Sequence, residues 1–452
     1  MKRRSLRALV SLSVLAATLA ASPTAAAPKR GSEAQRLHDK GVHCMDEIER
    51  NACAITHFEA LLELETRERE LVTDAMMRLI DLYRDEGRDD EVAVLLRRFW
   101  SVGMKLDSHG HVPWSTRFIP SELDMLLVVD MQQMVGSRVI KTLSEDARDS
   151  LLTCDEDRRN ELEIKRRFRR AEKKAARENL DVWEALQDQH ERDAARRAKR
   201  AEGRANTDAA PIFAEHICDL ARALGKTDLK SIRKIMGALN HHDARKSIGI
   251  AEIPDLDPLL VDAEANGRLR RVAPDHFILV DAQYAGAPVH VLKLDHDELT
   301  LVPENMAAAL VEARAKRRSH LNRELSQLVS RVPRDAGFFF VMTQAAMREM
   351  GFSGVKRSTR AFLEAILPKP KGLQIAAIFG DHLGVFTRVP TDTPGRGRML
   401  ISVANAMVAN ADDDEETSKW LEGLDIAESS DRKALLASYL ISARKLQKLM
   451  LQ

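Results

Sequence analysis

A stretch from Asp155 to Arg204 limits the possible folds of this chain more than any other feature. It holds 16 basic and 13 acidic residues, and neither glycine nor proline occurs in it before Gly203. This composition favours a helix, but a helix that is polar on nearly every side cannot be buried in a core. Such a helix is stabilised in solvent by ion pairs between residues four positions apart. The sequence therefore predicts a charged helical insertion, residues 155–210, that projects from the fold.

One part of this insertion is strongly basic. Residues 165–177, KRRFRRAEKKAAR, carry eight basic side chains and only Glu172 against them. A local excess of positive charge can hold an anionic surface, such as lipid headgroups or a polyanionic wall polymer. A solvated helix face without a partner is the simpler interpretation. The whole chain balances 70 Lys and Arg against 69 Asp and Glu, so a nucleic-acid binder is not expected.

The first residues have the layout of a secretory signal peptide. Four basic residues open it, Lys2, Arg3, Arg4 and Arg7. The run from Ala8 to Ala21 is apolar and uncharged, and small residues follow it. That run is too short to span a bilayer, and no later run reaches the length of a membrane span. We expect cleavage near Ala26, no lipid-modified cysteine, and a mature protein that is periplasmic or secreted.

Export changes the interpretation of the four cysteines. In an oxidising compartment an even number of cysteines favours disulfides. Cys44 and Cys53 are close in sequence, and Cys154 and Cys218 flank the charged insertion, so we favour these two pairs. A zinc site is the functional alternative, although no C-x-x-C spacing occurs. Four buried free thiols are the other alternative.

Residues 33–100 have the pattern of helical hairpins. Apolar residues fall on one face of the first hairpin at helical spacing: Ala54, Phe58, Leu61 and Leu62. The second hairpin resembles a tetratricopeptide repeat in four positions, Tyr83, Gly87, Glu91 and Val92. The resemblance implies a concave surface for a protein partner. An ordinary helical domain, residues 27–112, is the alternative, and Cys44 and Cys53 would join two antiparallel helices in either case.

The remaining chain alternates between strand and helix patterns. An apolar run passes into a helix at 124–134 and again at 336–347, and each pattern is followed by a hairpin, at 288–303 and 372–390. Helices are expected after both hairpins, over 303–332 and 397–411. We interpret this as an internal duplication, with chance similarity as the alternative. The predicted units are 113–330, which includes the insertion, and 331–452, which ends in an apolar helix. The expected class is α+β, mostly helical.

Serine and histidine motifs give little support for an enzyme. Ser353 and Lys356 have the Ser-x-x-Lys spacing of some envelope hydrolases, but three other pairs match it and no companion motif is present. Three clusters contain histidine: His109 and His111; His241, His242 and Asp243; Asp295, His296 and Asp297. Nothing in their spacing predicts that they converge on a metal. We therefore expect no catalytic residue, no metal and no cofactor.

These observations favour an exported, non-enzymatic binding or scaffolding protein of the cell envelope. The N-terminal helices predict a protein partner, and residues 165–177 predict contact with an anionic surface. A hydrolase using Ser353 and Lys356, or a histidine metal site, is the alternative from another class. A third possibility is an apolar ligand such as a lipid, suggested by Phe338, Phe339 and Phe340, although a buried central strand also explains that run.

Overall fold

The structure is a computed structural model, and its described residues form two compact units. It describes 32–46, 50–64, 66, 68–101, 118–178, 180–187, 191, 211–243, 245–316, 321–351, 370–380, 382–393, 395, 397–402, 424–442 and 446–447. The limit between the units falls at Met76 and Met77, within one helix. The predicted signal peptide, residues 1–26, lies outside the described part of the chain.

The first unit is built on two packed helices, α2 (Glu33–Asp46) and α3 (Asn51–Glu63). Phe58 is fully buried, and Gly41 allows this close packing, because a Cβ at Gly41 would lie 2.4 Å from Cε1 of Phe58. A disulfide joins Cys44 near the end of α2 to Cys53 at the start of α3. The cysteines thus lie at the junction of the two helices, as the sequence indicated.

Helices α4 (Arg69–Asp85) and α5 (Asp89–Ser101) follow. Gly87 lies in the turn between them with a φ of +69°, a backbone conformation that favours glycine. In the turn, the Arg88 guanidinium stacks over the ring of Tyr83 at 4.2 Å from its centroid. The apolar positions predicted from helical spacing, such as Leu79 and Leu96, are buried. The helical pattern of this region is therefore confirmed.

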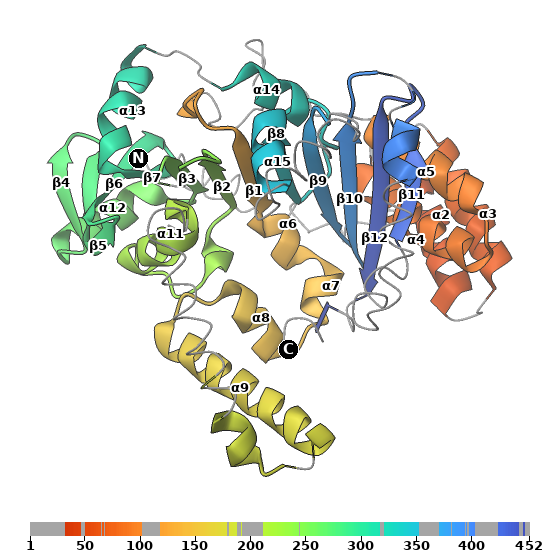
Figure 1. Ribbon diagram of the computed structural model, residues 1–452, viewed down its shortest axis with the longest axis horizontal. Coiled ribbons are helices and arrows are strands. Elements are labelled where there is room, and N and C mark those ends of the chain that lie inside the picture. The colour runs from red at the N-terminus through yellow and green to blue at the C-terminus, as the bar shows by residue number, and fades with distance from the viewer. Residues whose placement is uncertain are drawn as a thin grey trace, which may run out of the picture. The chain divides into compact units, whose positions relative to one another are not determined.

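The second unit contains one antiparallel sheet of 12 strands (Figure 1). The strands lie in the order β11-β12-β10-β9-β8-β1-β2-β3-β7-β6-β5-β4. Their bounds are β1 Met125–Asp130, β2 Lys234–Leu239, β3 Ser247–Glu252, β4 Leu269–Ala273, β5 His276–Tyr284, β6 Ala287–Asp295, β7 Glu298–Pro303, β8 Phe338–Thr343, β9 Gly372–Phe379, β10 His382–Pro390, β11 Leu424–Glu428 and β12 Ala434–Ser442. The sheet takes strands from both of the predicted α+β segments, and the α+β class is confirmed.

Strands β1 and β8 lie side by side at the centre of this sheet. Their register pairs Leu127 with Phe340, and the pairs on either side run symmetrically from Met125–Met342 to Val129–Phe338. Each strand passes directly into a helix, β1 into α6 (Met131–Gly136) and β8 into α15 (Gln344–Gly351). The two predicted strand-to-helix patterns are thus confirmed, and the structure places them next to each other.

The other described helices of this unit are α7 (Arg138–Lys141), α8 (Glu145–Leu152), α9 (Glu156–Glu178), α11 (Ile212–Ala223), α12 (Leu256–Ala265), α13 (Glu304–Lys316) and α14 (Arg323–Val329). Short polar side chains begin several of them. Ser137 and Ser144 each accept a hydrogen bond from the backbone N–H three residues later, which satisfies a donor that has no partner within the helix. Asp130 does the same for Gln133, so β1 ends where α6 begins.

The hairpins predicted at 288–303 and 372–390 are confirmed as β6–β7 and β9–β10. The expected C-terminal helix is wrong over Ala434–Ser442, which forms strand β12. This strand lies between β10 and β11 and is buried along most of its length. A strand covered on both faces has a nearly continuous apolar sequence, and such a run also contains every position of a helical apolar stripe.

Candidate functional site

The described part of the charged insertion, 155–178, 180–187 and 191, forms a helical arm, and the rest of the predicted insertion lies outside the described residues. We use "the charged arm" for α9 and a short helix at 182–187, together residues 156–187. Figure 1 shows the arm below the sheet, with the short helix alongside α9. The two helices pack through small residues, Ala171 and Ala175 of α9 against Ala185, with Val182 and Leu186 beside them. Small side chains allow the two backbones to approach closely, so a short apolar seam holds the arm together.

Acidic residues of α8 hold the base of the charged arm. Arg158 of α9 donates to Asp149 at 2.8 Å and to Asp146 at 3.2 Å, and it also pairs with Glu161. The hydrogen bonds that Arg158 donates to Glu161 and Asp149 raise the pKa of its guanidinium above the ordinary value. Arg169 reaches the same Asp146 from about three turns further along α9. This network fixes the direction in which α9 leaves the fold.

A second disulfide, Cys154–Cys218, closes the base of the charged arm. Both cysteines are buried, and 64 positions of sequence separate them. Arg159 donates to the Cys218 sulfur at 3.0 Å and to the Thr153 carbonyl at 3.0 Å. The structure therefore contains the two cysteine pairs that the sequence favoured, and the second joins the two ends of the insertion.

Large apolar side chains are exposed on the charged arm. Trp183 is 69% exposed, Ile164 55% and Phe168 38%. The rings of Phe168 and Trp183 meet edge to face with their centroids 5.9 Å apart. Isolated exposed apolar residues are common, but a group of them marks an interaction surface. The sequence showed these residues only as sparse apolar positions and gave no sign that they gather in solvent.

The cations of α9 are spread around the helix, and Arg166 and Lys173 face away from Phe168, because successive residues of a helix are about 100° apart. Some are paired along the helix, such as Lys165 with Glu161 at 2.9 Å and Arg167 with Glu163. Arg166 and Lys173 form no ion pair with any residue that the structure describes. Exposed ion pairs between residues four apart contribute little stability. Over residues 156–187 the charged arm carries ten basic and eight acidic residues, and its excess of positive charge is concentrated in residues 165–177.

The candidate histidines do not converge. Nδ1 of His241 is hydrogen-bonded to the Asp124 carboxylate, and the ring of His242 lies 3.7 Å from that of His241, centroid to centroid. His296 lies in the exposed turn between β6 and β7. Within the described ranges, the three do not form a group of metal ligands. His109 and His111, and the pair Ser353 and Lys356, lie outside the described residues.

One group of possible metal ligands occurs in the part of the chain that the structure describes. It consists of Cys44, Cys53 and His57, whose ligand atoms lie within 4.8 Å of one another. The two sulfurs are joined as a disulfide, so neither is a thiolate that could bind a metal. The disulfide explains why these three residues gather.

A pair of histidines on adjacent strands is protonated with difficulty. Nε2 of His276 on β5 and Nδ1 of His290 on β6 are 2.8 Å apart and share a hydrogen bond. Burial lowers the pKa of both rings, and the neighbouring His290 lowers that of His276 further. Glu304 opposes the shift at His290. The pair is therefore held neutral, because two imidazolium rings could not share this hydrogen bond.

This pair predicts that stability falls on acidification. In the unfolded chain both rings take up protons near pH 6.5, whereas in the folded chain they take them up at lower pH. The free energy of unfolding should decrease as the pH falls below 6.5, until the folded pKa is reached. Urea unfolding at several pH values in this range measures the free energy of unfolding as a function of pH. This free energy should change less with pH in the double variant His276→Gln, His290→Gln than in the wild type. The exposed His296→Gln variant should keep the wild-type slope, and equal slopes in all three proteins would contradict the prediction.

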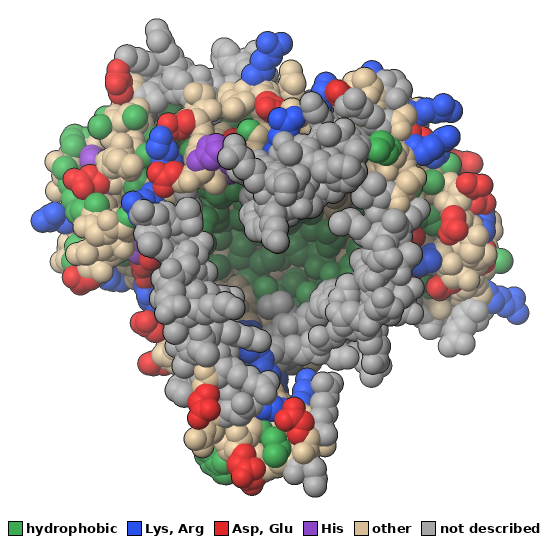
Figure 2. Space-filling view, in the orientation of Figure 1, with side chains coloured by type: hydrophobic (Ala, Val, Ile, Leu, Met, Phe, Trp, Pro, Cys, Tyr) green, Lys and Arg blue, Asp and Glu red, His purple; other side chains and the backbone are tan. Residues whose placement is uncertain are grey.

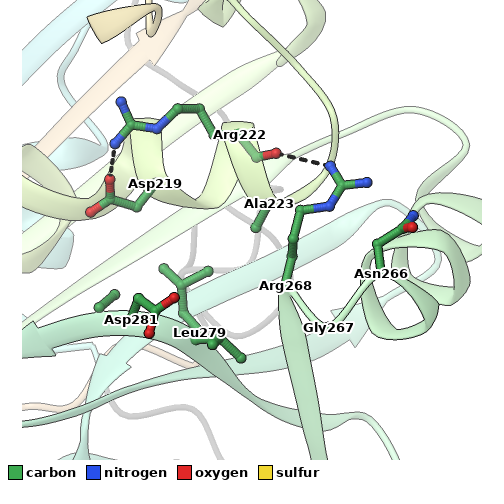
Figure 3. A pocket seen from close by; sticks show the side chains of 10 residues that line it. Asp219, Arg222, Ala223, Asn266, Gly267, Arg268, Leu279 and Asp281 are labelled. Carbon is green, nitrogen blue, oxygen red and sulfur yellow. Dashed lines mark hydrogen bonds and ion pairs between the residues drawn. The ribbon is translucent and has the colours of Figure 1, made fainter.

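Between α11, α12 and β5 lies a polar cavity of about 460 Å³ (Figure 3). Its cations are already paired. Arg222 donates to Asp219, and Arg268 donates to Asp262 at 3.0 Å and to the Arg222 carbonyl at 3.2 Å. The hydrogen bond from His216 and the charge of Arg222 hold the pKa of Asp219 below its ordinary value. The charges of this cavity are satisfied within the protein, so it offers little to a charged ligand.

Two further observations bear on membranes and apolar ligands. Along the described residues, no helix is both long enough and apolar enough to cross a bilayer.

On the face shown in Figure 2, hydrophobic side chains form the floor of a hollow. Phe339 is fully buried in the sheet, whereas Phe338 and Phe340 are half-buried. Burial in a central strand thus accounts for only part of this phenylalanine run.

This chain has little similarity to known proteins. No family model matches the chain, and no curated protein matches it. Two solved structures of the protein TP0453 are weakly similar. Crystal form III has 9% identity and a TM-score of 0.29, over 54% of this chain and 95% of that one. Crystal form I has 8% identity and a TM-score of 0.33, over 74% of this chain and 96% of that one.

Proposed function

We propose that this protein is an exported, non-enzymatic binding or scaffolding protein of the cell envelope, and that its charged arm holds an anionic lipid surface. The observation that carries the proposal is the exposed pair Phe168 and Trp183 on an arm whose residues 165–177 carry eight basic side chains and one acidic side chain. The two disulfides fit a periplasmic or extracellular location, where such bonds persist. The N-terminal helices, with their resemblance to tetratricopeptide repeats, supply a surface for a protein partner.

A lipid surface explains the composition of the charged arm better than a soluble polyanion does. A polyanion would be held by cations alone and would leave exposed tryptophan and isoleucine without a role. At a bilayer interface, cations pair with headgroups while amphipathic rings enter the boundary between headgroups and acyl chains. Trp183 and Ile164 supply the apolar part, and Arg166 and Lys173 supply charges that no described acidic residue neutralises.

Neutralising two cations of the charged arm should weaken membrane binding strongly. Each cation near an anionic surface contributes ~1 kcal/mol, so the double variant Arg166→Gln, Lys173→Gln should bind phosphatidylglycerol vesicles about 30-fold more weakly. Co-sedimentation with vesicles measures this. The exposed residue Arg270, on β4, provides a matched control, and Arg270→Gln should bind as the wild type does. Binding of the wild type should be lost in phosphatidylcholine vesicles and at high salt.

A second variant separates lipid from polymer. Trp183→Ala should weaken binding to phosphatidylglycerol vesicles while leaving binding to soluble polyphosphate unchanged, because only the bilayer offers an apolar phase. Val272→Ala, which removes another exposed apolar side chain on β4, is the control. If the wild type binds polyphosphate but no vesicle, the lipid assignment is wrong. If it binds neither, the charged arm has no anionic partner of this kind.

The duplicated architecture is the second part of this proposal. From the centre outward, β1, β2, β3, β7 and β6 on one side match β8, β9, β10, β12 and β11 on the other. The symmetric register of β1 and β8 supports this correspondence. This correspondence differs from the one expected from the sequence, which paired the hairpin 288–303 (β6–β7) with the hairpin 372–390 (β9–β10). In the correspondence proposed here, β9–β10 matches β2 and β3, and β6–β7 matches β11–β12. Strands β4 and β5 are then an addition to the first of the two predicted α+β segments, residues 113–330.

A further inference from the structure

A second cavity lies where α14, β9, β10 and the turn between β11 and β12 meet. Its volume is about 580 Å³, and four cations line it, Arg331, Lys371, Arg388 and Lys433. Three of them are exposed at its edge, whereas Arg388 is only 7% exposed. Three carboxylates, Glu324, Asp392 and Asp431, also line the cavity, so it combines a buried guanidinium with groups of both signs. It lies entirely within the second unit and shares no residue with the charged arm.

The strand pattern places Arg388 in the interior. Along β10, alternate residues are buried, among them Phe386, Arg388 and Pro390. Gln374 stands opposite Arg388 on β9 and is itself fully buried. The Arg388 guanidinium donates to Oε1 of Gln374 at 2.6 Å, and the Gln374 amide in turn donates to the Leu328 carbonyl at the end of α14. One side of the guanidinium is therefore held by a buried hydrogen-bond chain.

The rest of the guanidinium has no partner among the residues that the structure describes. Its five N–H donors make a single hydrogen bond, the one to Gln374, and no carboxylate lies within ion-pair distance. Elsewhere, other partly buried arginines are paired, as Arg84 is with Asp425. Burial and the charge of Arg331 lower the pKa of Arg388 to about 10, although the negative charge of Asp431 opposes this shift. A buried cation left without a counter-charge is unfavourable for folding.

The nearby acidic groups already have hydrogen-bond donors. Asp431 accepts from the Ser429 hydroxyl at 2.7 Å and from the Lys433 backbone N–H at 3.1 Å. Glu324 accepts from the Gln344 backbone N–H at 2.6 Å. These carboxylates leave Arg388 without a direct ion pair. An oxyanion entering the cavity would provide the direct ion pair that Arg388 lacks among the described residues, where Asp431 acts on it only from a distance.

We propose that this cavity binds a small organic anion through a phosphate or carboxylate group. The free N–H groups of Arg388 form the bidentate contact that planar guanidinium makes with such oxyanions. Arg331, Lys371 and Lys433 attract the anion and hold its outer part. The volume of the cavity exceeds what one phosphate fills, so an organic portion accompanies the charged group. The ligand is either a soluble metabolite-like anion or the headgroup of a phospholipid, and both present the same oxyanion.

The test measures binding of inorganic phosphate to the full-length mature protein by calorimetry, with chloride at matched ionic strength. Wild type should bind phosphate, and Arg388→Gln should bind it at least about tenfold more weakly, since a charged hydrogen-bonded contact is lost. Arg388→Lys keeps the charge without the bidentate geometry and should fall between them. Arg398→Gln, an exposed arginine outside the cavity, should bind as the wild type does.

Two exposed positions protect the test against a folding defect in the Arg388 variants. Arg331→Gln and Lys371→Gln should fold normally and should each weaken phosphate binding. Phosphatidylglycerol vesicles distinguish the two sources of the oxyanion. If the protein binds these vesicles but not inorganic phosphate, and Arg388 is needed for that binding, the ligand is a phospholipid headgroup. If the protein binds inorganic phosphate, the ligand is a soluble anion. Trp183→Ala should leave phosphate binding unchanged, which separates this site from the charged arm. Equal phosphate binding in wild type and all cavity variants, or no binding of either probe at millimolar concentration, would overturn the proposal.

Discussion

Phe213→Ala is expected to lower the free energy of unfolding of the second unit by about 3–5 kcal/mol. Phe213 lies in the first turn of α11 and is almost fully buried. Its ring rests on the centre of the sheet, over strands β2 and β3. Removing it leaves a cavity between α11 and the sheet, and the strands below are held by pairing on both sides and cannot move in to fill it. Urea unfolding followed by circular dichroism measures the loss.

Two glycines create the space for this ring. Gly237 and Gly249 stand opposite each other on β2 and β3. A Cβ at Gly237 would lie 2.4 Å from Cε1 of Phe213, and one at Gly249 would lie 2.6 Å from its Cβ. No side chain fits at either position without displacing the ring. The two glycines therefore form a slot in the sheet surface into which α11 packs.

The slot can be tested as a pair. Gly237→Val should destabilise the wild type by about 1–3 kcal/mol through overpacking, and should do so much less in the Phe213→Ala background, where the space is vacant. Gly136→Ala is the control, because a Cβ at Gly136 meets nothing within 4 Å. An equal effect of Gly237→Val in both backgrounds would show that Phe213 does not occupy the slot.

The local sequence pattern correctly predicted the elements whose apolar and polar residues recur at one regular spacing, either that of a strand or that of a helix. The alternation of Val289 and Val291 with polar neighbours, followed by a polar turn, identified β6 and β7. The charge density of α9 identified a helix outside the core. In these segments the local preference and the final environment agree, so short-range reasoning was sufficient.

The same reasoning failed where burial removes the period. Leu435, Leu436 and Ala437 are consecutive and all buried in β12, so a helical stripe and a covered strand fit them equally well. This segment is a strand because β10 and β11 form hydrogen bonds with both of its edges. Those partners are distant or separate segments of the chain, so the sequence of β12 itself does not reveal them.

The candidate sites show the same division. The basic patch of the charged arm was visible in sequence, because its cations are contiguous. The exposure of Trp183 depends on how the short helix packs against α9, which no spacing indicated. The Arg388 cavity was missed because its cations come from segments up to about a hundred positions apart. The only indication of this cavity in the local sequence is Arg388, an arginine at a buried position of a strand with alternating burial. That arginine indicates a binding site only once the structure shows no carboxylate paired with it among the described residues.

The disulfide at the base of the charged arm is expected to contribute the second large effect. Replacing both Cys154 and Cys218 by serine should lower the free energy of unfolding by about 4 kcal/mol, because the bond closes a loop with a sequence separation of 64 and so restricts the unfolded chain. Cys154 and Cys218 are buried, so two serine hydroxyls in their place add a smaller penalty. Urea unfolding of the oxidised wild type and the double variant measures the difference.

The first disulfide provides the comparison that isolates loop length. Cys44 and Cys53 are only 9 positions apart, so Cys44→Ser with Cys53→Ser should cost about 2–3 kcal/mol on the same argument. The two bonds belong to different units, so the unfolding of each must be followed by its own probe. Reduction of the wild type should reproduce the double variants, since it removes the same constraints. Equal losses of stability on removing the two disulfides, each measured in its own unit, would contradict this argument. Restriction of the unfolded chain would then not explain the effect of the second disulfide. The contacts of Arg159 with Cys218 and Thr153 would become the explanation to test for that bond.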